Sequence, residues 1–322
     1  IQLLNAGFEV VVLDNLSNSS VCVCERIRNL TGKDFVFVDV DIRDHNKLSE
    51  VFQQFDFSSV LHFAALKAVG ESALMPIKYY DNNVTGLLNL LTVMSNYNVK
   101  SLVFSSSATV YGAPASLPLV EETPLAKATN PYGMSKLMSE NILEDLYCSD
   151  SSWDIVCLRY FNPVGADPSG LIGEDPLGVP TNLMPVICQV ASGKREKVTI
   201  FGGDYNTLDG TGVRDYIHVV DLAKGHLKAL QYISSPKGFQ VFNLGTGKGC
   251  SVIEIITEFE AQSGVSIPFE ISNRRTGDVA SCYASVKRAA ALLNWTADLG
   301  LSSMCADSWR WTSLNPNGYH KD

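Results

Sequence analysis

Short β-branched runs alternate with longer amphipathic stretches over much of this 322-residue chain, and no other feature constrains its fold as strongly. Parallel strands need a crossover connection, which is usually a helix, so the pattern predicts β-α-β units around a parallel sheet. The strands that we expect are six continuous apolar runs, at residues 9–13, 35–40, 60–63, 102–104, 155–158 and 240–243. Such runs suit strands that are covered on both faces. The predicted fold class is therefore α/β, with a doubly wound, mostly parallel sheet.

A change in composition near residue 163 divides the chain. From there on, proline- and glycine-rich loops become frequent, which is typical of a second lobe. We expect residues 1–162 to form the nucleotide-binding sheet domain, and residues 163–322 mainly a smaller α/β lobe that binds the substrate. A late strand near residues 240–245 would return to the first sheet. Ligands of a doubly wound sheet bind beyond the carboxyl ends of its strands, so the site is predicted at that edge.

The first seven residues do not begin as a Rossmann-like nucleotide-binding sheet usually begins. Such a sheet starts with a strand and a glycine-rich turn of the G-x-G-x-x-G type, whereas residues 1–7 resemble the end of a helix closed by Gly7. We therefore expect that the first strand and the glycine-rich turn, roughly 15 to 20 residues, are missing from this sequence. Retention of a dinucleotide by the chain as given is in doubt for that reason.

Composition argues against several other functions. Apolar residues make up 46% of the chain, enough for a full core, and no apolar run reaches the ~18 residues of a membrane helix. The net charge is -9, with 25 Lys and Arg against 34 Asp and Glu and no long basic block, so we expect neither a nucleic-acid nor a membrane partner. The eight cysteines lack C-x-x-C spacing, which favours free thiols in the cytoplasm.

Tyr132 and Lys136 are the strongest candidates for chemistry. They stand four residues apart, behind a proline that suits the first turn of a helix, so both would lie on one face. A cation beside a phenol stabilises the phenolate and lowers a pKa that is normally about 10, which makes the tyrosine a usable base. The spacing alone is weak evidence, because Tyr283 and Lys287 repeat it. Only the first pair follows a strand that ends in serines, residues 105–107, where a hydroxyl would lie beside Tyr132.

Other polar residues indicate a nucleotide and a diphosphate. Asp14 closes the first expected strand, where a carboxylate accepts both hydroxyls of an adenosine ribose and repels a 2′-phosphate. NAD is therefore favoured over NADP, with a simple turn aspartate as the alternative. Arg214, Arg274 and Arg275 lie in glycine-containing loops, from which a guanidinium can hold a diphosphate. Surface salt bridging is the alternative, and we favour it for Arg274.

One group of acidic and histidine side chains has a spacing that suggests a metal site. Asp215, His218 and Asp221 stand three residues apart. Asp221, however, precedes a Leu-Ala pair in the way that a helix N-cap does. We predict no metal.

Six segments, taken together and in this order, resemble the UDP-glucose (UDP-galactose) 4-epimerases, a family of extended short-chain dehydrogenases/reductases. They are FAALKAVGES at 63–72, SSSATVYG at 105–112, YGMSK at 132–136, LRYFNP at 158–163, GEDP at 173–176 and GVRDYIH at 212–218. The resemblance runs from residue 1 to about residue 319, and any one segment alone is much less specific. It implies a Rossmann-like sheet, tightly held NAD and a UDP-sugar substrate.

The resemblance also implies a role for each matching residue. Ser107, Tyr132 and Lys136 are the expected catalytic residues. The expected NAD contacts are Asp14, Asn15, Asn18, Ser19, Asp41, Ile42, Phe63, Ala64, Lys67, Asn82, Ser107, Tyr132, Lys136 and Phe161. The expected UDP-sugar contacts are Lys67, Ser107, Tyr132, Asn162, Asn182, Leu183, Thr199, Ile200, Phe201, Arg214, Arg275, Asp278 and Cys282.

The implied reaction interconverts UDP-galactose and UDP-glucose through a 4-keto intermediate. Tyr132, as a phenolate, would take the proton of the 4-hydroxyl while C4 gives a hydride to NAD. The ketone would then turn over, anchored by its UDP, and recover the hydride on its other face. Hydride chemistry belongs to the cofactor, whereas the protein contributes orientation and a tuned base. The resemblance further implies galactose metabolism, and a homodimer that pairs helices around residues 83–96 and 132–146.

Two residues depart from the pattern of the family. Met134 stands where many relatives carry lysine, but this is not a base position, so the chemistry should survive. Cys282 falls where some relatives have tyrosine. The smaller side chain resembles members that admit N-acetylated sugars, so UDP-N-acetylglucosamine and UDP-N-acetylgalactosamine are further expected substrates.

Two other functions stay open. A sugar-nucleotide 4,6-dehydratase shares the fold, NAD and the Tyr/Lys pair, but it needs a further acid and base. Residues 107–109 read Ser-Ala-Thr, without a carboxylate for that step. A catalytically silent scaffold that binds NAD or a sugar nucleotide would agree with the absent glycine-rich turn. The joint presence of Ser107, Tyr132 and Lys136 speaks against it.

Overall fold

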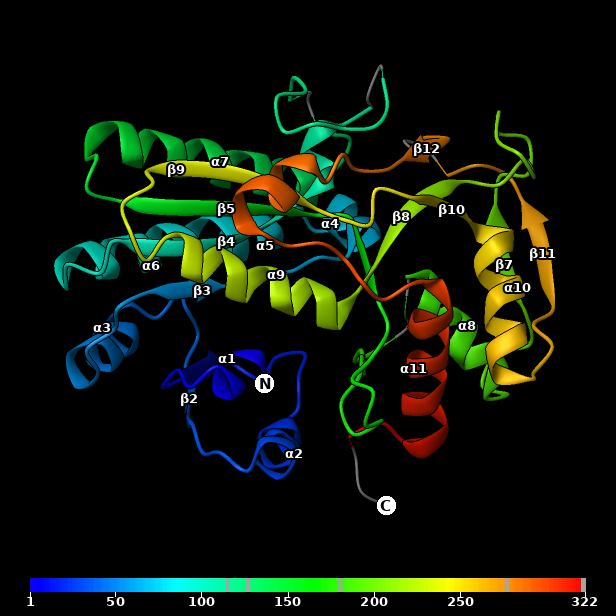
Figure 1. Cartoon of the computed structure of the whole chain (residues 1–322), viewed down its shortest axis with the longest axis horizontal. Helices are drawn as coiled ribbons and strands as arrows, with labels where there is room; N and C mark the ends of the chain where they lie inside the picture. Colours follow the sequence, from blue (N-terminus) through cyan, green and yellow to red (C-terminus); the bar gives the residue numbers. More distant parts are fainter. Residues whose placement is uncertain (114–115, 126–127, 179, 181, 276–277, 320–322) are drawn as a thin grey trace.

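A computed structural model describes residues 1–113, 116–125, 128–178, 180, 182–275 and 278–319 (Figure 1). Its main sheet is parallel, in the order β3-β4-β5-β9. These strands are Val60–His62, Ser101–Ser107, Asp154–Tyr160 and Phe239–Leu244. The late strand β9 pairs with β5, so the expected return of the chain to the first sheet is confirmed.

The two other expected strands form a separate parallel pair, β1 (Val11–Asp14) and β2 (Val36–Asp39). All six expected strands are therefore confirmed, with ends shifted by at most three residues. Within the described residues, no hydrogen-bonded strand joins this pair to β3. A short helix, α1 (Gln2–Asn5), precedes β1, and its buried Leu4 packs in a small core with Phe35.

The remaining elements connect and cover these sheets. The other α-helices are α2 (Cys22–Thr31), α3 (His45–Gln54), α4 (Val69–Leu74), α5 (Pro76–Tyr80), α6 (Gly86–Asn96), α7 (Pro131–Ser149), α8 (Leu183–Ala191), α9 (Val219–Tyr232), α10 (Val252–Ser263) and α11 (Leu301–Leu314). The other strands are β6 (Asn162–Val164), β7 (Val198–Phe201), β8 (Val213–His218), β10 (Gly249–Ser251), β11 (Phe269–Ser272) and β12 (Ser281–Cys282). Short π-helical turns cover Asp81–Thr85 and Ala289–Leu293, and a 3₁₀ turn covers Ala108–Tyr111. None of these described helices is both long and apolar enough to cross a membrane.

Alternate residues of β5 point into two different cores. Ile155 and Cys157 pack into a core that also contains residues of α3, α6 and α7. Val156 and Leu158 pack into a second core, on the side of α9. Figure 1 shows α7 and α9 on opposite sides of the sheet. Because helices cover both faces, the strand is buried between its two end residues, and the doubly wound α/β fold class is confirmed.

A second lobe lies at one end of the main sheet (Figure 1). Its core brings together Ile187 of α8, Ile256 of α10 and Cys305 of α11. Strand β8 pairs with β10, β12 and β6, while β7 pairs with β11. Since β6 follows directly after β5, the carboxyl end of the main sheet leads straight into this lobe.

Candidate active site

Helix α7 presents the Tyr132–Lys136 pair beside the main sheet. Asn130 caps this helix, because its side chain accepts a hydrogen bond from the backbone N–H of Gly133 at 2.9 Å. Pro131 occupies the first turn, where its missing N–H costs nothing. Tyr132 and Lys136 are therefore one helical turn apart on the same face, as the spacing predicts.

Lys136 is buried, and β4 holds its ammonium group. The Nζ atom donates a hydrogen bond to the backbone carbonyl of Ser105 at 2.6 Å and lies 4.8 Å from the ring centre of Phe104. Burial lowers the pKa of Lys136 to about 8, although the nearby Glu140 carboxylate opposes this shift. The lysine can therefore change its charge close to neutral pH.

The pKa of Tyr132 departs from the sequence-based expectation. Burial raises the pKa of its phenol, and a hydrogen bond from the Ser107 hydroxyl opposes the rise. Ser107 is the last residue of β4, so the predicted strand does bring a hydroxyl to the tyrosine. The expected lowering of the phenol pKa is not met by the protein groups alone, because desolvation outweighs the hydrogen bond.

The repeated spacing at Tyr283 and Lys287 does not give a second pair of this kind. Tyr283 follows β12 outside any helix, and its backbone carbonyl accepts a hydrogen bond from the N–H of Leu119 at 2.9 Å. Lys287 begins the next helical turn. The two side chains therefore do not share a helix face.

An ion pair that the sequence analysis did not identify fixes α7 against β5. Arg159 and Glu140 are each 4% exposed, and their Nη2 and Oε2 atoms are 2.6 Å apart. Arg159 also donates hydrogen bonds to the Tyr111 hydroxyl and to the Glu121 carbonyl, both at 3.0 Å. The Ser106 hydroxyl donates to Glu140. A buried pair of this kind holds both elements in register, because loss of one partner leaves an uncompensated charge.

A cavity beside β1 collects most residues that are expected to bind the adenosine side of NAD. Its lining includes Asp14, Asn15, Asn18, Asp41, Ile42, Ala64 and Asn82. Asp14 Oδ1 accepts hydrogen bonds from the N–H of Leu16 at 2.7 Å and from the Ser19 hydroxyl at 2.8 Å. Hydrogen bonds from Arg43 hold the pKa of Asp41 well below its usual range. Both carboxylates are thus fixed acceptors, which suits the hydroxyls of a ribose.

The other expected NAD contacts have partners from the second half of the chain. Phe63 stacks with His226 of α9, with ring centres 4.8 Å apart. The Lys67 ammonium lies 3.1 Å from the Glu174 carboxylate. Phe161 is buried in a small core against which Cys282 packs. The sequence analysis assigned no role to His226 or Glu174, and no local pattern would have linked either one to a partner more than a hundred residues away.

Two arginines with different partners dominate the expected UDP contacts. Arg214 of β8 lies 3.7 Å from the Asp278 carboxylate and is opposite Cys282 in the register of β8 with β12. The guanidinium of Arg275 lies 3.8 Å from the ring centre of Phe201, a cation–π contact. Arg274 instead pairs with Asp204 at 2.7 Å, as expected for a surface salt bridge. Asn162 is exposed at the start of β6, and Asn182 directly precedes Leu183, the first residue of α8.

The side chain of Ile200 does not face the expected UDP site. Residues of β7 alternate, so Ile200 is buried in the core of the second lobe. Thr199 and Phe201 are only partly buried and point to the other side. Of these three expected contacts, Ile200 can offer only its backbone, because a strand places successive side chains on opposite faces.

The three residues with metal-like spacing have other partners. His218, not Asp221, caps α9, because its ring accepts a hydrogen bond from the N–H of Val220 at 3.1 Å. Asp221 instead accepts the backbone N–H of Leu299 at 2.7 Å. Asp215 accepts hydrogen bonds from the loop that follows β9. Among the described residues, no three His, Cys, Asp or Glu side chains are grouped so as to hold a metal ion.

Comparisons with known proteins cover both lobes of the chain. The model of the NAD dependent epimerase/dehydratase family matches residues 2–245. UDP-glucose 4-epimerase of Bacillus subtilis (strain 168) is 54% identical over 319 residues, which are 99% of this chain and 94% of that protein. The crystal structure of UDP-glucose 4-epimerase from Bifidobacterium longum in complex with NAD+ and UDP is 52% identical, with a TM-score of 0.96, and the match covers 98% of this chain and 94% of that one. The enzyme from Stenotrophomonas maltophila, solved with NAD and formylated UDP-arabinopyranose, is 47% identical with a TM-score of 0.95, again over 98% and 94% of the two chains.

Proposed function

The chain belongs to the NAD dependent epimerase/dehydratase family, and we propose that Ser107, Tyr132 and Lys136 carry out its reaction. That reaction is the reversible interconversion of UDP-galactose and UDP-glucose at C4 of the sugar, with NAD as the cofactor. The observation that carries the functional conclusion is the identity of 54% with a UDP-glucose 4-epimerase over both lobes. Support for the residue roles comes from helix α7, where the buried Lys136 lies one turn from Tyr132. The phenol of Tyr132 is hydrogen-bonded to Ser107, the last residue of β4.

The residues present fit NAD. The cavity beside β1 offers two fixed carboxylates, Asp14 and Asp41, to ribose and adenine groups. In the proposed arrangement the part of that cavity formed by residues 14–18 and 41–42 holds the adenosine side. The central part is held by Phe63, Ala64, Lys67 and Asn82, and Phe161 packs near the nicotinamide. The chemistry that NAD supplies when bound is reversible acceptance of a hydride from the sugar C4.

Tyr132 is the proposed base for the sugar 4-hydroxyl. Its phenol oxygen receives the hydroxyl proton as C4 is oxidised, and gives a proton back to the oxygen when C4 is reduced. Burial raises the pKa of Tyr132, so the phenolate needs nearby positive charge. In the proposal Lys136, one helical turn away, supplies that charge in its ammonium form. Ser107 donates a hydrogen bond to the phenol oxygen. All three groups therefore serve the transfer of the same proton, that of the sugar 4-hydroxyl.

The arginines of the second lobe hold the UDP half of the substrate in this proposal. Arg214 and Arg275 each offer a planar guanidinium, which matches the oxygens of a diphosphate. Neither arginine belongs to the elements that carry Tyr132 and Lys136, so the nucleotide is held apart from the reacting carbon. A keto sugar anchored only at its UDP end can therefore turn over between oxidation and reduction.

Purified protein supplied with NAD and UDP-galactose tests the reaction. Formation of UDP-glucose, with transient near-ultraviolet absorption of reduced nicotinamide, is expected. A stable 4-keto-6-deoxy product would indicate dehydration instead. Absence of any product, together with NAD and sugar-nucleotide binding, would indicate a silent scaffold.

N-acetylated UDP-sugars are a further proposed substrate pair, on the strength of Cys282. This side chain is partly buried beside the core that contains Phe161, and its strand pairs with Arg214. Cys282→Tyr should abolish turnover of UDP-N-acetylglucosamine while leaving most of the turnover of UDP-glucose. Cys282→Ser, which stays small, is the matched control and should keep both activities. Equal loss on both sugars in Cys282→Tyr would contradict the proposal.

A homodimer that uses the helices beside the active site is also proposed. The expected helices are α6 and α7, on which Leu88 and Met138 are 46% and 39% accessible. Beside them, Leu74 of α4 and Ile77 of α5 are 84% and 82% accessible. Helices α4 and α5 pack on α7, so a partner seated there would abut the helix of Tyr132. Ile77→Lys should give a monomer in size-exclusion chromatography with light scattering. Leu208→Lys, which changes a fully exposed leucine of the other lobe, should leave the dimer intact.

Two further proposals concern setting and organisation. All eight cysteines are free thiols, which supports a reducing compartment such as the cytoplasm. The division into an NAD-binding domain at 1–162 and a UDP-sugar lobe at 163–322 stays a prediction. It is supported by the separate core of the second lobe, whose members lie between Val164 and Trp309. Limited proteolysis that cuts first near residue 163 would support the boundary.

A further inference from the structure

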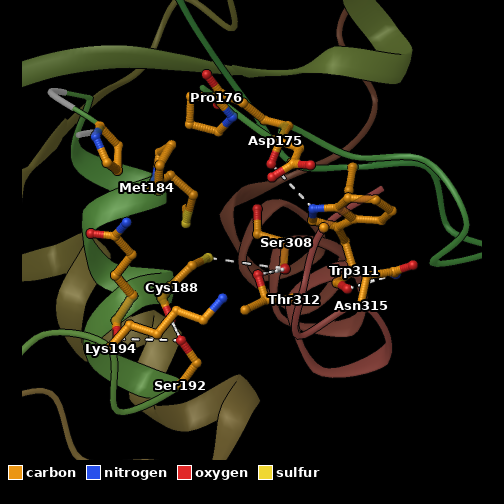
Figure 2. Close-up of a pocket in the computed structure, with 17 residues that line it drawn as sticks. Asp175, Pro176, Met184, Cys188, Ser192, Lys194, Ser308, Trp311, Thr312 and Asn315 are labelled. Carbon is orange, nitrogen blue, oxygen red and sulfur yellow. Dashed lines mark hydrogen bonds between the residues drawn. The ribbon is translucent and has the colours of Figure 1, made fainter. Parts of the chain in front are cut away.

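Gly173, Glu174 and Asp175 belong to a motif that this chain shares with the family, but the reaction described above gives them no role. Residues 171–175, here called the strap, run along the second lobe next to α11. Trp311 donates its indole N–H to the Glu174 carbonyl at 3.2 Å, and Asp175 accepts the backbone N–H of Tyr319 at 2.9 Å. Figure 2 shows Asp175 and Trp311 at the rim of a cavity of about 120 Å³ between the strap, α8 and α11. Trp311 and Tyr319 thus hold the strap in place.

Two glycines allow this close approach. A Cβ atom on Gly173 would lie 2.2 Å from the Trp311 ring, and one on Gly318 would lie 2.1 Å from the Asp175 carboxylate. Gly318 also has a φ of 68°, which L side chains rarely adopt. The strap is therefore packed against α11 and the segment after it without room for a side chain at either position.

Arg26 of α2 contacts both the strap and the segment that holds it. It donates hydrogen bonds to the Leu171 carbonyl at 2.8 Å and to the Asn315 side chain at 2.6 Å. Its guanidinium also lies 4.8 Å from the ring centre of Tyr319 and 5.5 Å from that of Trp311. Helix α2 follows the loop that carries Asp14 to Ser19, so this contact links the expected adenosine site to the strap.

Glu174 links the strap to the other side of the expected NAD site. Its carboxylate lies 3.1 Å from the ammonium of Lys67, in the segment after β3. The side chains of Lys67 and Glu174 are 66% and 37% exposed, so their attraction alone is weak. Held between Arg26 and Lys67, the strap completes a ring of contacts that runs from the loop after β1 through α2 to the segment after β3.

We propose that the strap retains the cofactor by closing this ring, with Arg26 and Glu174 as positioning residues. The inference rests on the proposed contact of Lys67 with NAD. Arg26 ties the helix after the β1 loop to the strap through Leu171 and Asn315, and Glu174 ties the strap to Lys67. Opening the ring lets the loop after β1 move away from Lys67, and NAD leaves faster.

Arg26→Met tests the proposal, with Arg28→Met as the matched control. Arg28 lies on the same helix and also makes an ion pair, hydrogen bonds and a ring contact, but with Asp34 and Phe35 instead of the strap. Two readouts are taken on each full chain: the rate of NAD release, followed by trapping the released cofactor with an added dehydrogenase, and amide hydrogen exchange of peptides that cover the strap. Arg26→Met should release NAD roughly tenfold faster, the effect of losing one or two hydrogen bonds. Exchange in the strap should rise as well, and Arg28→Met should change neither readout.

Several outcomes would overturn the proposal. Equal release rates in the two arginine variants would refute retention by the strap, and faster release without faster exchange would show that Arg26 acts by another route. Turnover of UDP-galactose by the unmodified chain separates this proposal from the proposed function, because NAD binding without turnover would refute the function and leave retention by the strap standing. If the unmodified chain binds no NAD, retention by the strap is refuted together with cofactor use by this chain.

A milder variant covers the case in which Arg26→Met fails to fold. Tyr319→Phe removes only the hydroxyl that donates to the Gly173 carbonyl at 2.9 Å and accepts from the Gly173 N–H at 3.0 Å. The ring that faces Arg26 stays in place. Release roughly threefold to tenfold faster is expected for loss of these bonds. An unchanged rate with faster strap exchange would also refute the proposal.

Discussion

The two halves of the proposed active site are built in different ways. Ser107, Tyr132 and Lys136 lie on a central strand and a long helix, within a span of 30 residues, and Lys136 is buried. Arg214, Arg275 and their partners come from short strands and loops spread over the second lobe, and they stay partly exposed. Regular elements hold groups in place more precisely than loops do. In the proposed function, proton transfer takes place in the rigid half, and UDP is bound by the adaptable half.

The ion pairs of the two halves differ in burial and in distance. Arg159 and Glu140 behind the catalytic helix are each 4% exposed and 2.6 Å apart. Arg214 and Asp278 are 21% and 39% exposed and 3.7 Å apart. Charges attract more strongly where water is excluded, and a buried charge without its partner is costly. Loss of one partner of the first pair should therefore cost stability, whereas in the proposed function the second pair can exchange its partner for a ligand.

The largest expected effect tests the rigid half. Tyr132→Phe should lower kcat about a thousandfold, because it removes the proposed base for the 4-hydroxyl and keeps the ring. Tyr283→Phe, at the repeated spacing, should leave kcat unchanged. Steady-state rates of UDP-galactose conversion measure both. A Tyr132→Phe variant with normal kcat would remove the basis for the proposed base.

Stability distinguishes the two ion pairs. Glu140→Gln should lower the free energy of unfolding by roughly 3 kcal/mol, because Arg159 is left buried without its countercharge. Asp278→Asn should cost less than roughly 1 kcal/mol, since its pair is exposed. Urea unfolding of both variants gives the comparison. Equal losses would mean that the two halves do not differ in rigidity.

Adjacent arginines test the adaptable half. Arg275→Ala should raise KM for UDP-galactose about tenfold with little change in kcat, because it removes one charged hydrogen-bond donor from the diphosphate. Arg274→Ala should change KM less than about twofold, because that arginine pairs with Asp204 at the surface. A large fall in kcat in Arg275→Ala would contradict a role limited to binding.

The smallest expected effect is the pH dependence that Lys136 adds to stability. Its pKa is lowered from 10.5 to about 8 in the folded protein, so the unfolded chain binds more protons between these values. The free energy of unfolding therefore rises with pH in that window. Between about pH 7.5 and about pH 9.5, the wild-type chain should gain roughly 1 to 2 kcal/mol relative to Lys136→Met. Activity should fall over the same range as the ammonium form is lost, and parallel stability curves for the two proteins would contradict the burial of this charge.

Sequence patterns predicted the strands and the helix of the rigid half. For the adaptable half they predicted candidate residues but not the contacts between them. The six strands and the start of α7 follow from local periodicity and from Asn130 and Pro131, which act within a few residues. The contact of Arg275 with Phe201 depends on how distant loops pack, and the alternation of β7 sends Ile200 into the core. No local pattern indicates the contact of Glu174 with Lys67, because Lys67 lies 107 residues earlier.

Helical periodicity by itself determined that Tyr132 and Lys136 share one face, since four residues make about one turn. It did not determine their acidity. The tertiary structure decided that burial lowers the pKa of Lys136 to about 8 and raises that of Tyr132. The physical reason is that desolvation depends on the strands and helices packed around a charge, and the carbonyl that accepts from Lys136 comes from Ser105, on a different element of the chain.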